Sequence, residues 1–224
     1  MASSTVRAVV FDLWDTLVDW PLEESRRLRL GWADRLGVSV ERLDELWYAA
    51  DAYRRRETGP LLPAVRALCD AVGTSVRPEE LVLSRLELTR TAFAANDGVL
   101  DTLADLRARG VAVGLVSNCS EDVAVVWPET ALAAAVDCAI FSALVGLMKP
   151  EAQIYGLVCA GLGVDAAECL FVGDGANGEL DGAARVGMTP VLVERSHGPH
   201  PWESVRDWSG LRVRRIADVL ALVS

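Results

Sequence analysis

The apolar residues follow two different patterns along the chain, which indicates two kinds of structure. Residues 6–11 form a short, largely β-branched apolar run, typical of a buried strand. From about residue 21 to residue 95, apolar positions recur at the spacing of amphipathic helices, with glycine and Gly-Pro breaks between them. This second pattern predicts helices at residues 22–36, 41–56, 61–71 and 78–94.

Beyond the turn sequence Asn96-Asp97-Gly98, predicted strands and helices alternate. Alternation of this kind predicts a parallel sheet with helices on both faces. We therefore expect an α/β fold, a Rossmann-like core of residues 1–18 and 97–224, interrupted by an all-helical cap of residues 19–96. The predicted strands of the second part are 111–116, 138–141, 169–172 and 189–193, and its helices are 100–109, 121–126, 151–160 and 179–186.

Charge and cysteine content narrow the classes of partner. The 224 residues carry a formal net charge of −10, which disfavours binding to nucleic acid or to an anionic membrane surface. The first residues lack the pattern of a secretory signal, and the five cysteines are an odd number without metal-ligand spacing. These features predict a cytoplasmic protein with reduced thiols. The oligomeric state is not predicted.

Four polar clusters follow the predicted strands, where parallel sheets bind their ligands. The first is FDLWDTL, which contains Asp12, and the second is Ser117-Asn118. The third is GLMKP, which contains Lys149, the single lysine of the chain. The fourth is VGDGANGELDGA, which contains Asp174 and Glu179. Each cluster alone is compatible with ordinary turn and helix-cap chemistry, but four in this order indicate a site.

The order and spacing of these clusters resemble the four motifs of the haloacid dehalogenase-like superfamily. Those motifs are an Asp that closes the first strand with a Thr four residues later, a Ser/Thr with Asn, a Lys-Pro before a helix, and Gly-Asp followed by a second acid. The resemblance covers roughly residues 5–18 and 97–193, and includes the phrases VLDTLADLRARGVAVGLVSN and VGLMKPEAQIY. The helical insertion resembles the family's cap in position and periodicity.

The resemblance implies a hydrolase, most simply a phosphatase, that acts on a small phosphorylated molecule. Asp12 would be the nucleophile that forms an aspartyl phosphate, and Lys149 and Ser117 would be the other catalytic residues. Ser117, Asn118 and Lys149 would bind the phosphate. Mg²⁺ would be held by Asp12, Asp174, Glu179 and the backbone carbonyl of Trp14, because a hard cation prefers oxygen ligands. Glu179 stands where the family usually has Asp.

One position departs from the phosphatase pattern. Phosphatases of the superfamily carry a second Asp two residues after the nucleophile as general acid and base, whereas this chain has Trp14. An indole N–H cannot shuttle a proton. Three functions follow: a phosphatase for substrates with good leaving groups such as acyl or aryl phosphates, a 2-haloacid dehalogenase-type hydrolase that uses Asp12, or a weakly active or non-catalytic phosphoryl-ligand binding module. Retention of Gly173-Asp174 favours the phosphatase.

Several other residues are given minor roles. We expect Asp15 to point away from the site and Asp181 to lie outside it. The arginines of the cap, including Arg54, Arg55 and Arg56, are interpreted as a solvated helix face. Cap tryptophans are interpreted as core packing, and His197 and His200 receive no role.

Overall fold

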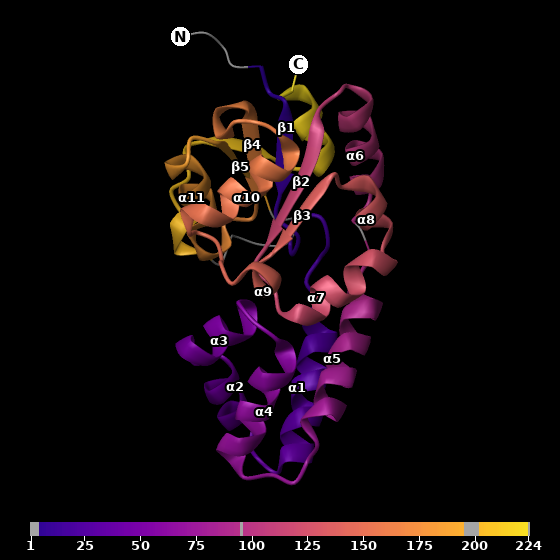
Figure 1. Ribbon diagram of the computed structural model, residues 1–224, viewed down its shortest axis with the longest axis vertical. Helices are drawn as coiled ribbons and strands as arrows, with labels where there is room; N and C mark the ends of the chain where they lie inside the picture. Colours follow the sequence, from indigo (N-terminus) through magenta and orange to yellow (C-terminus); the bar gives the residue numbers. More distant parts are fainter. Residues whose placement is uncertain (1–4, 95, 195–201, 224) are drawn as a thin grey trace.

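A six-stranded, all-parallel sheet is the centre of the computed structural model, which describes residues 5–94, 96–194 and 202–223 (Figure 1). The strand order is β3-β2-β1-β4-β5-β6. The predicted Rossmann-like α/β core is therefore confirmed, with one short edge strand, β6, that the sequence pattern missed. The strands are β1 (Ala8–Phe11), β2 (Ala112–Ser117), β3 (Cys138–Phe141), β4 (Cys169–Gly173), β5 (Thr189–Val193) and β6 (Leu211–Val213).

Helices cover both faces of this sheet, because successive strand residues point to opposite sides. Val9 and Phe11 of β1 belong to one apolar cluster, and Ala8 and Val10 belong to another. The first cluster lies under α6 and α8, and the second lies under α10 and α11 (Figure 1). The helices and 3₁₀ turns of the core are α6 (Val99–Ala108), α7 (Glu121–Val126), η1 (Trp127–Glu129), α8 (Ala131–Ala135), α9 (Ser142–Val145), α10 (Ala152–Leu162), η2 (Ala166–Glu168), η3 (Ala176–Gly178), α11 (Glu179–Arg185), η4 (Glu203–Val205) and η5 (Ile216–Ala221).

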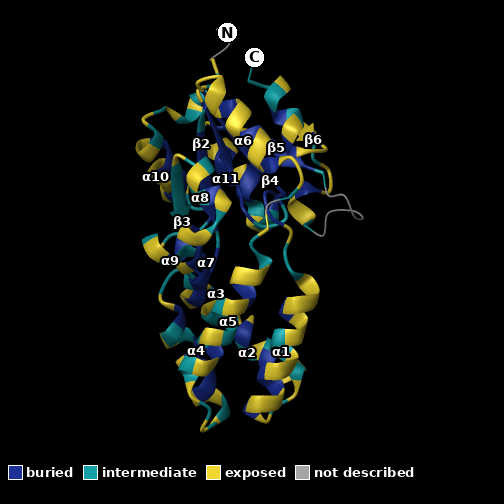
Figure 2. Cartoon of the chain, turned by 90° about the vertical axis from the view of Figure 1, so that its right-hand side faces the viewer, coloured by how far each residue is buried: buried dark blue, intermediate teal, exposed yellow. Residues whose placement is uncertain are grey.

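Between β1 and α6 the chain forms five helices with a separate apolar cluster, and we call these helices the helical insertion. Figure 2 shows the buried sides of these helices turned inward and their outer sides exposed. The insertion is anchored where the chain enters and leaves it. The side-chain amide of Asn96 donates to Asp19 Oδ1 at 3.0 Å, and the Asp19 backbone N–H donates to Asn96 Oδ1 at 3.2 Å. The helices are α1 (Leu22–Leu36), α2 (Val40–Trp47), α3 (Ala50–Glu57), α4 (Leu61–Val72) and α5 (Pro78–Ala92).

The single helix predicted over residues 41–56 is wrong, because the chain breaks there into α2 and α3. The Arg56 guanidinium donates through Nη1 to the carbonyl oxygen of Trp47, the last residue of α2, at 2.7 Å. A cationic side chain from the following helix thus satisfies a carbonyl that the break exposes.

Two further points concern the two histidines of the sequence and the possibility of a membrane-spanning helix. His197 and His200 lie outside the described residues. Within residues 5–94, 96–194 and 202–223, no helix combines the length and the apolar character needed to cross a bilayer.

Candidate active site

The topology of the sheet creates a crevice at the carboxyl end of β1. β1 lies between β2 and β4, and the chain continues from β2 toward one edge of the sheet and from β4 toward the other. Ligands of open α/β sheets bind at such a switch point. Asp12 directly follows β1 and Asp174 directly follows β4, and the Asp12 backbone N–H donates to Val172 O of β4 at 2.9 Å.

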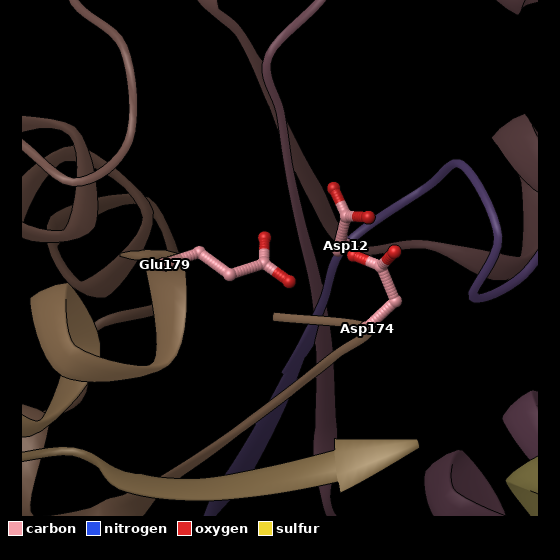
Figure 3. Close-up of side chains that lie close together, drawn as sticks. All are labelled: Asp12, Asp174 and Glu179. Carbon is pink, nitrogen blue, oxygen red and sulfur yellow. The ribbon is translucent and has the colours of Figure 1, made fainter. Parts of the chain in front are cut away.

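Three carboxylates converge in this crevice. Asp12, Asp174 and Glu179 each offer one oxygen, and these oxygens all lie within 4.8 Å of one another. Figure 3 shows Asp12 and Asp174 reaching the same point from neighbouring strand ends, while Glu179 extends toward them from the start of α11. Their exposed fractions are 6%, 2% and 0%. Like charges at this separation and depth repel strongly unless a cation or protons compensate them.

Lys149 supplies part of that compensation. Its ammonium group donates to Asp12 Oδ1, and to Glu179 Oε2 at 2.6 Å, and the residue is only 2% exposed. Burial alone would lower the pKa of Lys149, but the adjacent Asp12 and Glu179 carboxylates raise it above its usual value. Lys149 is therefore a fixed positive charge between Asp12 and Glu179.

Two glycines allow Glu179 to occupy this position. A Cβ on Gly173 would lie 2.1 Å from Glu179 Oε1, so a side chain there would collide with the carboxylate. The backbone N–H of Gly175 donates to the same oxygen at 3.0 Å, and Gly175 has a φ of +88°, which favours glycine. The loop after β4 thus accommodates the longer Glu side chain where the superfamily pattern has Asp.

One ammonium does not balance the three carboxylates, and the pKa values reflect this. Burial and, to a smaller extent, the neighbouring Asp12 carboxylate together raise the pKa of Asp174 to about 6. Burial raises the pKa of Glu179 to about 8, although Lys149 acts in the opposite direction. A divalent cation among these oxygens would stabilise the ionised forms. The donor set is entirely oxygen and matches the preference of Mg²⁺.

The residues after β2 contribute to the site mainly through Asn118. Its side chain holds the backbone of Lys149 from both sides: Nδ2 donates to Lys149 O at 3.0 Å, and Lys149 N–H donates to Asn118 Oδ1 at 2.7 Å. Asn118 therefore fixes Lys149. Ser117 ends β2 and is fully buried; among the described residues, its neighbours Asn118, Cys119 and Ser120 line the cavity above the carboxylates, and Ser117 does not.

Trp14 and Asp15 both border this cavity. Trp14 packs perpendicular to Trp20, with ring centroids 4.9 Å apart, and also contacts Phe93. Asp15 adopts a positive φ of 55°, and its Oδ1 accepts a hydrogen bond from the Trp20 backbone N–H at 2.9 Å. The Asp15 carboxylate thus anchors the chain where it enters the helical insertion. Asp181 is exposed, as predicted.

The cavity has a volume of about 310 Å³ and lies between the strand ends on one side and the helical insertion on the other. Arg56 and Glu57 of α3 line it, and their side chains form a buried ion pair at 3.0 Å. The interpretation of Arg56 as a solvated residue is therefore wrong, because its guanidinium packs over the Trp47 ring and the residue is only 4% exposed. Arg54 and Arg55 are exposed as expected.

Trp202 is a site residue that the sequence interpretation missed. Its indole N–H donates to Asp174 Oδ2 at 2.6 Å, and it lines the same cavity. It follows a histidine- and proline-rich stretch far from the motifs, so no local pattern identifies it.

Comparison with known proteins places this geometry in a family. Residues 6–187 match the model of the haloacid dehalogenase-like hydrolases. The chain is 31% identical over 226 residues to Phosphatase MT3486 of Mycobacterium tuberculosis, with 92% of this chain and 95% of the relative covered. It is 26% identical to (S)-2-haloacid dehalogenase 4A of Burkholderia cepacia, with 89% and 87% covered.

Among solved structures, a phosphatase of the same family from Thermococcus onnurineus has a TM-score of 0.75, with 97% of this chain and 98% of that chain covered and 23% identity. This likeness supports the fold. The family match spans most of the chain and includes all four motifs. The chain therefore belongs to the haloacid dehalogenase-like hydrolases.

Proposed function

We propose that this hydrolase is a Mg²⁺-dependent phosphatase that acts on a small phosphorylated molecule through an aspartyl phosphate on Asp12. The observation that carries the proposal is the convergence of three buried carboxylates around Lys149. Three relatives that are named as phosphatases support the proposal. Small phosphorylated molecules, rather than nucleic acid or membrane, fit a cavity of about 310 Å³ and the net charge of −10.

The residues that would hold the cation are Asp12, Asp174 and Glu179, together with the backbone carbonyl of Trp14. Their all-oxygen chemistry and their mutual repulsion fit a hard divalent ion. When bound, Mg²⁺ neutralises phosphate charge and orients the phosphoryl group.

The remaining steps follow from the chain's own residues. A carboxylate oxygen of Asp12 attacks phosphorus, a P–O bond forms, and the bond to the leaving oxygen breaks with its electron pair. Lys149 stabilises the negative charge on Asp12 and on the phosphate, while Asn118 fixes the lysine backbone. Ser117 ends β2, and the loop that begins at Asn118 lines the cavity and binds the phosphate oxygens. Water then hydrolyses the aspartyl phosphate, which restores Asp12 and releases inorganic phosphate.

Trp14 limits which leaving groups depart readily. General acid catalysis contributes about 10²–10⁴-fold. Trp14 cannot supply it, because an indole transfers no proton, and we assign Asp15 a structural role, because its Oδ1 accepts from the Trp20 backbone N–H. The proposal therefore favours acyl or aryl phosphates, whose leaving groups depart as stable anions.

A direct test compares hydrolysis of acetyl phosphate and p-nitrophenyl phosphate with Mg²⁺ and with EDTA. The proposal predicts phosphate release that requires Mg²⁺ and is lost in Asp12→Asn, with Asp181→Asn as the matched control. Metal-independent release, or unchanged release in Asp12→Asn, contradicts it.

A dehalogenase is the second candidate, because those relatives carry an aromatic residue at the Trp14 position and one relative bears that name. The cluster of Asp12, Asp174 and Glu179 argues against it, since halide departs without a metal. Chloride release from chloroacetate that persists in EDTA would establish the dehalogenase. No turnover of any of these substrates, with intact Mg²⁺ binding, would instead indicate a phosphoryl-ligand binding module.

Two further features complete the proposal. Residues 19–96 act as a cap that closes the cavity over a core of residues 1–18 and 97–224, because the insertion has its own apolar cluster and supplies one wall.

All five cysteines are free thiols, which supports a cytoplasmic location.

A further inference from the structure

The walls of the cavity above the carboxylates are unusually rich in aromatic side chains. Six of the 20 residues that line it are aromatic, against 6% of the chain as a whole. They come from the loop after β1, the helical insertion and the segment before η4, so three separate parts of the chain converge there. These residues are Trp14, Trp20, Trp47, Tyr48, Tyr53 and Trp202.

The two arginines on the same wall, Arg56 and Arg85, are already paired with carboxylates. The Arg56 guanidinium donates to Glu57 at 3.0 Å through Nε and to Trp47 O at 2.7 Å through Nη1. Arg85 pairs with the buried Asp122 at 3.0 Å. An anionic tail on a substrate would have to compete with these buried carboxylates, so the wall opposite the phosphate end favours an uncharged group.

The arrangement of rings suits a flat aromatic partner. Trp14 and Trp20 are perpendicular, with an interplanar angle of 86°. A ligand ring can pack against either of them by stacking or edge to face, and both arrangements are favourable. The planar Arg56 guanidinium lies 4.3 Å from the Trp47 ring centroid and 5.1 Å from that of Tyr53 and adds a further flat surface.

The size of the cavity limits the ligand. Its volume of about 310 Å³ lies at the lower end of the range of small-molecule sites, roughly 300–1,000 Å³. One ring and a phosphate suit this volume better than an extended substrate.

We propose that the substrates are monocyclic aryl phosphates, whose ring is held by the aromatic wall formed by Trp14, Trp20 and Tyr48. This inference rests on the proposed phosphatase function and names its substrate class. It agrees independently with the missing general acid, because a phenolate departs more readily than an alkoxide. As in the proposed reaction, the phosphoryl group is transferred to Asp12. The P–O bond to the phenol oxygen breaks, and that oxygen retains the electron pair.

Binding of phosphonates tests ring recognition apart from leaving-group chemistry. Phenylphosphonate and cyclohexylphosphonate share the anionic group, and neither has a P–O–C bond to break. Simple burial of apolar surface does not favour the phenyl ring over the cyclohexyl ring. By calorimetry with Mg²⁺ present, we expect phenylphosphonate to bind about 2- to 10-fold more tightly, the range for aromatic pairs beyond burial.

Variants locate the effect. Trp20→Leu should reduce the ratio of the two dissociation constants toward one, because it removes an aromatic ring from the wall. The hydrogen bond from the Trp20 backbone N–H to Asp15 does not depend on the side chain and is retained. Trp208→Leu is the matched control outside the cavity, and its ratio should equal that of the wild type. If Trp20→Leu does not fold, Tyr48→Leu tests the same wall, because Tyr48 is 49% exposed and tolerates replacement better.

Equal dissociation constants for the two phosphonates, or a ratio unchanged in the folded cavity variants, would overturn the inference. Acetyl phosphate has no ring and separates this failure from failure of the proposed function. If its Mg²⁺-dependent hydrolysis persists while the phosphonates bind equally, only ring recognition is refuted. If hydrolysis and phosphonate binding are both absent, both proposals are refuted.

Discussion

Replacement of Trp14 by aspartate should restore general acid catalysis for poor leaving groups. Trp14 borders the cavity two residues after Asp12, the proposed nucleophile, and its indole cannot transfer a proton. In Trp14→Asp, a carboxyl group at this position could protonate the departing oxygen, so an alkyl phosphate would leave as the alcohol.

The expected gain follows from the size of general acid catalysis. Proton transfer contributes about 10²–10⁴-fold, which corresponds to roughly 3–5 kcal/mol of barrier. We expect the lower end, about 10²-fold in kcat for propyl phosphate, because the new carboxyl is not held by a dedicated partner. The kcat for p-nitrophenyl phosphate should change less than about 5-fold, since nitrophenolate needs no proton, whereas loss of Trp14 from the aromatic wall should raise its KM.

The substitution also removes packing. Trp14 is half-buried and contacts the rings of Trp20 at 4.9 Å and Phe93 at 5.6 Å. Loss of these contacts should lower the free energy of unfolding by about 2 kcal/mol. Urea unfolding establishes that the variant is folded before kinetic comparison.

Trp14→Asn separates the proton from the space that the indole vacates, because an amide has a similar shape to a carboxyl and transfers no proton. The ratio of kcat for propyl phosphate to kcat for p-nitrophenyl phosphate is the decisive readout. A folded Trp14→Asp with an unchanged ratio, or an equal rise in Trp14→Asn, would refute the reasoning.

Three more predictions address the charges of the site. Lys149→Met should lower the free energy of unfolding, measured by urea denaturation in EDTA, by about 3–5 kcal/mol, since it leaves two buried carboxylates without their cation. Arg77→Met, at an exposed position, is the control, and an equal change in both variants would contradict the argument. In EDTA, the melting temperature should fall from pH 4.5 to about 8, because the pKa values raised to about 6 for Asp174 and about 8 for Glu179 make the folded state bind more protons than the unfolded state. Mg²⁺ should reduce the slope of melting temperature against pH, and a flat profile in EDTA would contradict this prediction. Trp202→Phe should weaken Mg²⁺ binding about 10-fold in calorimetry, since it removes the 2.6 Å hydrogen bond to Asp174. The control Trp208→Phe should leave the affinity unchanged, and equal affinities in the two variants would argue against a positioning role for Trp202.

The strands of the core and the meeting of Asp12, Lys149, Asp174 and Glu179 were predictable from sequence. Buried parallel strands leave continuous apolar runs, and residues that follow such strands gather at one edge of the sheet. Each of these four residues directly follows a strand, or lies in a loop or at a helix start near its carboxyl end, so local pattern and order suffice to place them.

Contacts between distant segments could not be predicted in this way. The break between α2 and α3 carries no glycine or proline and is stabilised by Arg56, nine residues beyond Trp47. The burial of Arg56 depends on Glu57 and on aromatic rings from two helices, whereas its sequence context is a run of three arginines. Trp202 reaches Asp174 across 28 residues of chain, and no spacing rule indicates that contact.

Calorimetric titration of Mg²⁺ into the protein tests the central claim most directly, because it asks whether the buried carboxylates share a cation. We predict one saturable site in the wild type, affinity at least about 10-fold weaker in Asp174→Asn, and wild-type affinity in Asp181→Asn, whose side chain is exposed. Absence of a site in the wild type, or equal affinity in Asp174→Asn, would contradict the account.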